Sequence, residues 1–303
     1  MYSFKKVFLA LFVLFSFCRI SETAYAETGE TPSQANRCLT TVARILSSGD
    51  QRHAKGRLLC PGDQVRPIAG KQTLVLCHNG KSLTKGKEGE VGRLCSSGPK
   101  RLQQKGRLRF LKSRGTTDKE GKLSIVQPLG TMIMQLRPDF AWKPVKGSTH
   151  YEVTLQGPNS KWEQKVTSGH RLNYPKSWPA LEYGKAYYVT VYAYQNEKII
   201  GSDRTKLNLL YEEEISLVNE AVAAIHQLSL SPVEAAKELD AVYMSFKLLD
   251  QSIGVLQNLK DSGQSNSQLN RLLGDRYYQV GQPELAPRAE EAQLPTSMKL
   301  PQK

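Results

Sequence analysis

Four cysteines gathered in one short stretch constrain this 303-residue chain more than any other feature. Cys38, Cys60, Cys77 and Cys95 lie within 58 residues, at spacings of 22, 17 and 18 positions, and no two of them form a C-x-x-C pair. Zinc sites usually need such pairs so that two ligands converge on one ion, and the spacing therefore disfavours zinc. In an oxidising compartment, two disulfides would each stabilise a small domain by roughly 2–4 kcal/mol. Of the three possible pairings, we favour Cys38 with Cys60 and Cys77 with Cys95.

The N-terminus predicts export. Lys5 and Lys6 precede an apolar run from Val7 to Phe17, and the segment Ala24-Tyr25-Ala26 then supplies small residues. This order is typical of a cleavable signal peptide over residues 1–26, with an uncleaved signal anchor as the alternative. No later stretch is long and apolar enough to span a bilayer, so we expect no transmembrane segment after signal cleavage. The chain is therefore expected in the periplasm or outside the cell.

Residues 36–98 predict a small β module held by the disulfides. We expect one or two helical turns over Asn36–Leu46, followed from Gly56 by strands and turns. The short apolar runs LLCPGDQVRP, QTLVLCHNGKSL and EVGRLC are divided by Pro-Gly, Asn-Gly and Lys-Gly turns. The segment His78-Asn79-Gly80-Lys81 predicts a hairpin, because Asn-Gly readily takes the positive φ values of a tight turn. With the linker that follows it, this first domain covers residues 36–127.

The basicity of the mature protein belongs to this first domain alone. Residues 27–127 contain 20 Lys and Arg against 8 Asp and Glu, whereas residues 128–303 contain 19 of each. Such placement implies an anionic partner for this domain. The charge is densest in KRLQQKGRLRFLKSR, where the candidate polyanion-binding residues are Lys100, Arg101, Lys105, Arg107, Arg109, Lys112 and Arg114.

Two interpretations of this basic stretch remain open. Leu108 and Phe110 alternate with cations, as in a strand with one buried face, and the cations could contact an anionic envelope polymer. Alternatively, the charges only protect an exposed strand edge from pairing with another chain. Nucleic acid is disfavoured as a partner, since export removes the chain from it and aromatic stacking residues are scarce here.

Residues 128–210 give the clearest β pattern. Four residues of the last long strand, Tyr187, Val189, Val191 and Ala193, fall on one face, while Tyr188, Thr190, Tyr192 and Tyr194 fall on the other. Together with Trp142 and Tyr151-x-Val153, the spacing Leu181-x-x-Gly184-x-x-Tyr187 resembles the fibronectin type III domain. The resemblance implies a β-sandwich in which Leu181, Gly184 and Tyr187 build a tyrosine corner.

Residues 211–293 predict helices. Apolar residues in Tyr211–Leu228 recur three and four positions apart, and Ser231-Pro232-Val233-Glu234 has the serine, proline and glutamate of a capped helix start. Residues 294–303 are expected to form a disordered tail.

A period of 34 residues runs through this region. Leu239 and Tyr243 recur as Leu273 and Tyr277, and LLGDRYYQVGQPELA resembles a tetratricopeptide repeat at Leu273, Gly274, Tyr277 and Ala286. The earlier copy departs from that pattern, with Asp240 in place of the glycine and Ser252 in place of the alanine. Pro287 is expected to end or kink the last helix.

No linear motif predicts a reaction. The five histidines are scattered, and the chain lacks the H-E-x-x-H, G-x-S-x-G and G-x-x-x-x-G-K-[ST] motifs. We therefore expect no catalytic residues, no metal and no cofactor.

The expected fold is multidomain, β then α: a disulfide-stapled β module, a fibronectin type III-like sandwich and tetratricopeptide-like hairpins. This order resembles a group of bacterial envelope proteins, and the resemblance implies export and contacts with other proteins. We expect a non-catalytic scaffold that binds an envelope protein through its helical and sandwich modules. The alternative is a binding module for an anionic glycan or cell-wall polymer, led by the basic first domain.

Overall fold

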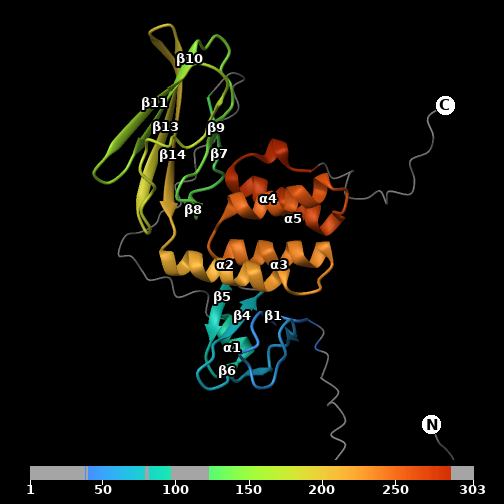
Figure 1. Cartoon of the computed structure of the whole chain (residues 1–303). Helices are drawn as coiled ribbons and strands as arrows, with labels where there is room; N and C mark the ends of the chain where they lie inside the picture. The colour runs from blue at the N-terminus through green and yellow to red at the C-terminus, as the bar shows by residue number, and fades with distance from the viewer. Residues whose placement is uncertain (1–37, 39, 79–81, 97–122, 288–303) are drawn as a thin grey trace, which may run out of the picture. The chain divides into compact units, whose positions relative to one another are not determined.

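The computed structural model describes residues 38, 40–78, 82–96 and 123–287. The signal segment, the basic stretch 100–114 and the tail 294–303 lie outside these residues. Among the described residues, no helix combines the length and the apolar character that a membrane crossing requires. Three blocks follow one another along the chain, a small β module, a β-sandwich and a helical region (Figure 1).

The β module is built on a four-stranded antiparallel sheet with the order β2-β1-β4-β5. Its strands are β1 (Ala43–Ile45), β2 (Leu58–Leu59), β4 (Thr73–Cys77) and β5 (Ser82–Gly86). A second pair joins β3 (Gln64–Val65) to β6 (Gly89–Glu90), and the short helix α1 (Val91–Ser96) follows. The disulfides are Cys38–Cys60 and Cys77–Cys95, which is the favoured pairing.

Two local predictions in this module are wrong. The expected helical turn over Asn36–Leu46 is absent from the described residues 40–46 of this segment, where Ala43–Ile45 is the strand β1. Every residue of β1 is buried, so the segment shows no alternation of apolar and polar residues that would have identified a strand. The expected strand-like run EVGRLC instead becomes α1 from Val91 onward, and Gly92 packs tightly there, its amide donating to the Pro61 carbonyl at 2.6 Å.

The β-sandwich has a three-stranded and a five-stranded sheet. The smaller sheet has the order β12-β9-β7, with β7 (Ile125–Gln127), β9 (Phe140–Trp142) and β12 (Arg171–Leu172). The larger has the order β11-β10-β13-β14-β8, with β8 (Met132–Ile133), β10 (His150–Gln156), β11 (Lys161–Val166), β13 (Ala186–Gln195) and β14 (Lys198–Leu209). Inward residues of both sheets form one apolar core, and Trp142 is fully buried in it with its ring centroid 5.2 Å from that of Tyr151.

The predicted tyrosine corner is present. The buried Tyr187 hydroxyl accepts a hydrogen bond from the backbone N–H of Glu182 at 2.9 Å, and the Leu181 amide donates to the Leu136 carbonyl at 2.9 Å. Gly184 has a φ of 68°, and a Cβ at this position would lie 2.4 Å from the ring of Tyr211. Glycine is therefore required here both by the left-handed backbone and by the packed ring. Through Tyr211, the corner also supports the start of the first long helix.

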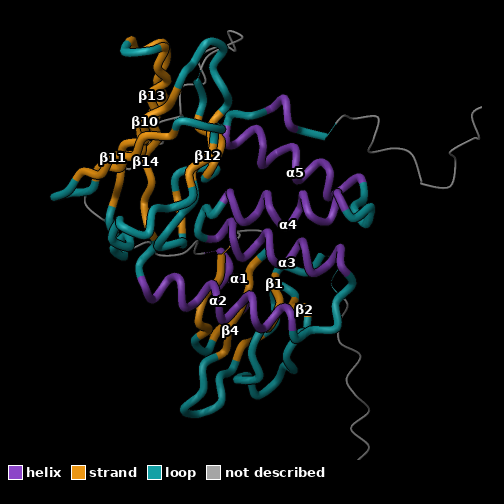
Figure 2. Tube along the Cα trace, turned by 45° about the horizontal axis from the view of Figure 1, so that its top comes forward, coloured by secondary structure: helices purple, strands orange, loops and turns teal. Residues whose placement is uncertain are grey.

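The helical region contains α2 (Glu212–His226), α3 (Pro232–Ser245), α4 (Leu249–Asp261), α5 (Ser267–Val280) and the short 3₁₀ helix η1 (Pro283–Leu285). Each helix packs against the next one along the chain (Figure 2). The predicted cap of α3 is confirmed, since the Ser231 hydroxyl accepts from the Glu234 amide and the Glu234 carboxylate accepts from the Ser231 amide. Acidic residues occupy the first turn of α2, where they favour the positive end of the helix dipole.

The β module and the helices share one apolar core, although the sandwich separates them in sequence. Leu46, Leu74, Leu76 and Leu83 from the sheet pack with residues of α2 and α3, which include Val218, Ala221, Ile225, Leu239 and Val242. Figure 1 and Figure 2 both show the strands β1 and β4 beside these two helices. The helices thus supply the apolar layer that such a small sheet needs on its second face.

We expect Tyr187→Phe to lower the free energy of unfolding of the sandwich by roughly 1–2 kcal/mol, because the part-buried hydrogen bond from the Glu182 amide loses its acceptor. Tyr188→Phe is the matched control, since Tyr188 lies on the outer face of the same strand and its ring is 39% exposed. Urea unfolding followed by tryptophan fluorescence measures both variants. Equal losses would contradict the assignment of the two faces.

Candidate functional site

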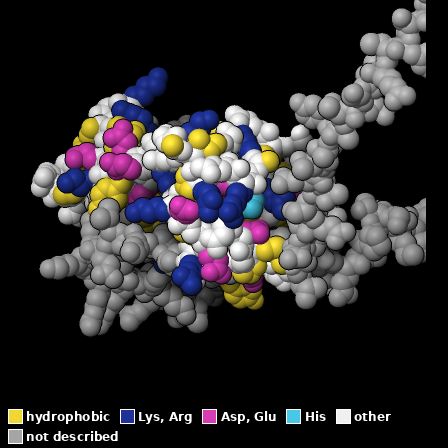
Figure 3. All heavy atoms as spheres, turned by 90° about the horizontal axis from the view of Figure 1, so that it is seen from below, with side chains coloured by type: hydrophobic (Ala, Val, Ile, Leu, Met, Phe, Trp, Pro, Cys, Tyr) yellow, Lys and Arg dark blue, Asp and Glu magenta, His cyan; other side chains and the backbone are white. Residues whose placement is uncertain are grey.

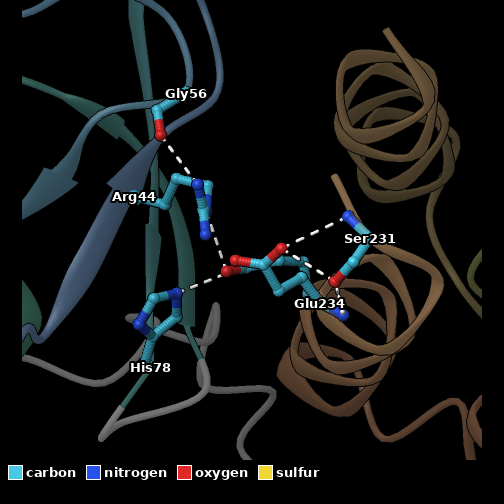
Figure 4. A network of polar contacts seen from close by, with 6 residues as sticks. Arg44, Gly56, His78, Ser231 and Glu234 are labelled. Carbon is cyan, nitrogen blue, oxygen red and sulfur yellow. Dashed lines mark hydrogen bonds and ion pairs between the residues drawn. The ribbon is translucent and has the colours of Figure 1, made fainter. Parts of the chain in front are cut away.

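A buried polar cluster joins the β module to α3 (Figure 4). The Glu238 carboxylate accepts from Arg44 Nε of β1 at 2.8 Å and from His78 Nε2 at the end of β4 at 2.9 Å. Arg44 also donates to the Gly56 carbonyl at 2.7 Å. The side chains of Arg44 and Glu238 are each only 7% exposed. We call Arg44, His78 and Glu238 the junction cluster.

The junction cluster is organised to keep a buried carboxylate charged. Burial alone would raise the pKa of Glu238, but the hydrogen bond and charge of His78, and then those of Arg44, outweigh it and lower the pKa below its ordinary value. Both carboxylate oxygens are occupied by groups of the chain itself. The cluster therefore acts as a clamp between two modules that are 160 or more residues apart in sequence.

A second buried cluster lies on the opposite side of α3. Arg276 of α5 forms two hydrogen bonds of 2.8 Å to the two carboxylate oxygens of Asp240, and the Ser252 hydroxyl of α4 donates to Asp240 Oδ1 at 2.6 Å. The Arg276 and Asp240 side chains are 2% and 3% exposed. We call these three residues the helix cluster, because one carboxylate holds three helices together.

The helix cluster explains both departures from the repeat pattern. Asp240 stands where the repeat pattern has glycine and Ser252 where it has alanine, and these two residues are hydrogen-bonded to each other. In the later copy, the equivalent residues Gly274 and Ala286 are also neighbours, since a Cβ built on Gly274 would lie 3.7 Å from that of Ala286. The two predicted copies thus differ at this contact, which is a hydrogen bond in the earlier copy and a contact of small residues in the later one. The paired departure is the signal in the sequence that could have predicted the hydrogen bond.

The other repeat positions lie in apolar cores. Leu239 is buried and Tyr243 half-buried between α2, α3 and the β module. Leu273 and Tyr277 are buried between α3, α4 and α5, where the Tyr277 hydroxyl donates to Gln257 Oε1 at 3.1 Å. These residues therefore contribute to the packing of the helices.

The outer face of the five-stranded sheet carries a row of tyrosines. Tyr188, Tyr192 and Tyr194 of β13 all point away from the sandwich core. The guanidinium of Arg204 lies 4.2 Å from the centroid of the Tyr188 ring, and the His150 ring stacks on Tyr194 with centroids 4.8 Å apart. We call this surface the tyrosine face.

Charges of both signs surround the tyrosine face. Partial burial, followed by the negative charge of Glu152, raises the pKa of the Tyr194 phenol. On the neighbouring strand β11, Lys161 forms an ion pair with Glu163, and the hydrogen bond and charge of Glu163 raise the pKa of this lysine. The aromatic row, not a net charge, is therefore the distinguishing property of this surface.

The helical region offers one shallow hollow of about 240 Å³ between α3 and α5. Its lining residues are Lys237, Ser267, Gln268, Arg271, Leu272 and Asp275. Lys237 Nζ donates to Gln268 Oε1 across it at 2.6 Å, so part of its polar lining is already paired internally.

The seven cations of the stretch 100–114 lie outside the described residues, but the β module carries further cations of its own. Its exposed Lys and Arg residues are Arg52, Arg57, Arg66, Lys71, Lys85, Lys87 and Arg93. Within the described ranges, no three His, Cys, Asp or Glu side chains gather as metal ligands would. The sequence assigned the basicity to the whole first domain and the candidate binding residues to the stretch 100–114. Which cations of the module reach the surface depends on how its loops fold.

No protein-family model matches the chain, and no curated protein matches it in sequence. Among solved structures, the fibronectin type III domain of the human collagen alpha-1(XX) chain matches with 20% identity, over 32% of this chain and 95% of that one, at a TM-score of 0.25. A computationally redesigned β-sandwich protein matches with 14% identity, over 30% of this chain and 93% of its own, at a TM-score of 0.24. The fibronectin type III-like character of the sandwich is assigned here from its two sheets and from the Tyr187 hydrogen bond.

We expect Glu238→Gln to destabilise the protein by about 3–5 kcal/mol near neutral pH, because Arg44 loses its buried partner. The pKa of Glu238 is lower in the folded than in the unfolded state, so this stabilisation is present above the ordinary value of 4.5 and is lost as the pH falls through the folded pKa. Urea unfolding between pH 7 and pH 3 measures it. The difference between wild type and variant should shrink in acid, while the exposed control Glu220→Gln should show little difference at any pH. A constant difference would contradict the lowered pKa.

We expect Asp240→Ala to cost about 3–5 kcal/mol, because it leaves the buried Arg276 unpaired. Adding Arg276→Met should recover much of this loss, since a buried ion pair replaced on both sides by apolar groups is often nearly neutral. Thermal unfolding of the single and double variants forms a double-mutant cycle. Additive losses would show that the two residues do not depend on each other.

Proposed function

We propose that the chain is a non-catalytic, exported envelope protein that binds a partner protein, with the helices as an internal support and the tyrosine face as the main contact surface. The signal pattern of residues 1–26 and the two disulfides support export, since disulfides persist mainly in oxidising compartments. The observation that carries the proposal is the tyrosine face itself.

The composition of the tyrosine face suits a protein partner. Tyrosine and arginine are enriched in the energetically important centres of protein interfaces, and tyrosine buries a large area at little entropic cost. Tyr188 and Arg204 support each other through the contact of 4.2 Å, and His150 does the same for Tyr194. Side chains held in this way lose little conformational freedom when a partner covers them.

We propose that the helices are tetratricopeptide-like hairpins whose usual binding surface is partly used within the chain. The corresponding contacts at Asp240 with Ser252 and at Gly274 with Ala286 support a repeated unit of 34 residues. Apolar residues of α2 and α3 pack on Leu46, Leu74, Leu76 and Leu83 of the β module. On this proposal the helices hold the β module and the sandwich, and the hollow between α3 and α5 contributes a minor contact.

The test is photo-crosslinking in the native envelope. We expect a photoreactive phenylalanine analogue at Thr190, which lies between Tyr188 and Tyr192, to give a discrete covalent adduct with one protein. The same analogue at Asn173, an exposed residue next to β12 of the other sheet, is the matched control and should give none.

The adduct should depend on the tyrosines. Combining Tyr188→Ser with Tyr192→Ser should reduce its yield about tenfold or more, as expected for loss of interface centres. Tyr278→Ser, which removes a 69% exposed tyrosine of α5, should leave the yield unchanged. If position 190 gives no adduct, or gives one that survives the double substitution, the tyrosine face is not the contact surface.

A further inference from the structure

One buried aspartate connects two loops of the β module through hydrogen bonds to their backbones. Asp50 Oδ1 accepts from the backbone amides of Arg52 at 2.9 Å and His53 at 2.8 Å, and its Oδ2 accepts from the amide of Arg66 at 2.6 Å. Asp50 is only 7% exposed. A single carboxylate therefore fixes the backbone of two arginines that are 14 positions apart in sequence.

Further contacts make this paired loop unit rigid. The Gln51 amide donates to the Arg66 carbonyl at 2.8 Å, and the Ile68 amide donates to the Gly49 carbonyl at 2.8 Å. His53 Nε2 donates to the Gln64 carbonyl at 3.0 Å, because a carbonyl oxygen can only accept. Segments 49–53 and 64–68 are thus joined by hydrogen bonds along their whole length.

Each described acid of the β module already has a partner within the module. The Asp50 carboxylate accepts hydrogen bonds from backbone amides, and the Asp63 carboxylate likewise accepts from the Cys60 amide at 2.8 Å. Glu88 and Glu90 are the remaining described acids of the module, and they pair with Arg66 at 3.0 Å and Arg93 at 3.5 Å. Figure 3, seen from the side on which β6 and α1 lie in Figure 1, shows dark blue Lys and Arg side chains gathered beside a histidine, with acids at their margin.

We propose that Arg52 and Arg66, continued by the exposed Lys71, form a docking surface for an extended anionic polysaccharide. This surface is separate from the tyrosine face, so the proposal does not depend on the binding of a partner protein. It includes none of residues 100–114, since it is built only from described residues of the β module.

The chemistry of the surface fits carboxylate groups repeated along a polymer. Arginine presents a planar fork of donors that matches a carboxylate, and here the backbones of two arginines are fixed before the ligand arrives. The ion pair of Arg66 with Glu88 is exposed, with the side chains 45% and 68% accessible, so an incoming carboxylate displaces Glu88 at little cost.

A polymer fits better than a single anion because each exposed contact is weak. Isolated ion pairs at a surface contribute little, whereas linked contacts reinforce one another through the effective concentration that the chain connecting them provides. Arg57, Lys85 and Lys87 are also exposed on this module, and no hydrogen bond or ion pair of their side chains is found among the described residues. They add to the positive charge of the module.

The test measures binding of the full mature chain to polygalacturonate, with neutral dextran as the comparison. We expect saturable binding to polygalacturonate that weakens as salt rises, and none to dextran. Combining Arg52→Gln with Arg66→Gln should lower the affinity about tenfold or more. Lys146→Gln with Lys176→Gln removes the same charge from exposed positions of the sandwich and should leave the affinity nearly unchanged.

Asp50→Asn distinguishes a built surface from simple net charge. This variant makes the protein more positive, so attraction by net charge alone predicts tighter binding. The proposal predicts weaker binding, because the amide side chain cannot accept all the hydrogen bonds that fix Arg52 and Arg66. Circular dichroism must show a native spectrum for this variant; if it does not fold, the arginine pair compared with the lysine pair decides alone.

Three results would overturn the proposal. They are equal losses of affinity in the arginine and lysine pairs, tighter binding by a folded Asp50→Asn variant, and binding to phosphatidylglycerol vesicles without binding to polygalacturonate. The last result would identify a membrane surface as the anionic partner. Because crosslinking at Thr190 is measured separately, failure of this proposal is distinguishable from failure of the tyrosine face.

Discussion

The apolar contact between the small β sheet and the helices is the constraint on which the rest of the structure depends. A sheet of strands only two to five residues long cannot bury enough surface alone, and α2 and α3 supply its second layer. Leu46, Leu74, Leu76 and Leu83 meet these helices across a gap of more than a hundred residues in sequence. The chain must therefore fold the sandwich as an insertion between two parts that belong to one core.

Helix α3 provides the central carboxylate of both buried clusters. Glu238 and Asp240 are two positions apart, so they point to nearly opposite sides of the helix. Glu238 binds Arg44 and His78 of the β module, while Asp240 binds Ser252 and Arg276 of the following helices. Removing a partner from such a buried pair costs far more than the pair contributes over an apolar replacement, so the two clusters specify the arrangement more than they stabilise it.

Both proposed contact surfaces lie on parts of the chain that the packing of the helices leaves exposed. The helices are occupied by internal packing, which leaves the outer sheet of the sandwich and the outer loops of the β module facing solvent. On the tyrosine face, aromatic rings are held by Arg204 and His150. On the β module, Asp50 holds two arginines. In both cases neighbouring groups fix the exposed side chains or their backbone in advance, which lowers the entropic cost of binding.

Local chemistry alone determined the features of this protein that involve neighbours in sequence or a simple period. The cap at Ser231, the two faces of β13 and the corner at Tyr187 depend on residues at most a few positions apart, so spacing predicted them. The tertiary structure decided the rest. β1 is buried on both sides and shows no alternation, and Arg44 looks solvated in sequence because its partner Glu238 is 194 positions away. Likewise, nothing in the sequence around Asp50 indicates that its carboxylate accepts from the backbone amide of Arg66. A buried charge is stable only beside its partner, and only the folded chain shows which residue that is.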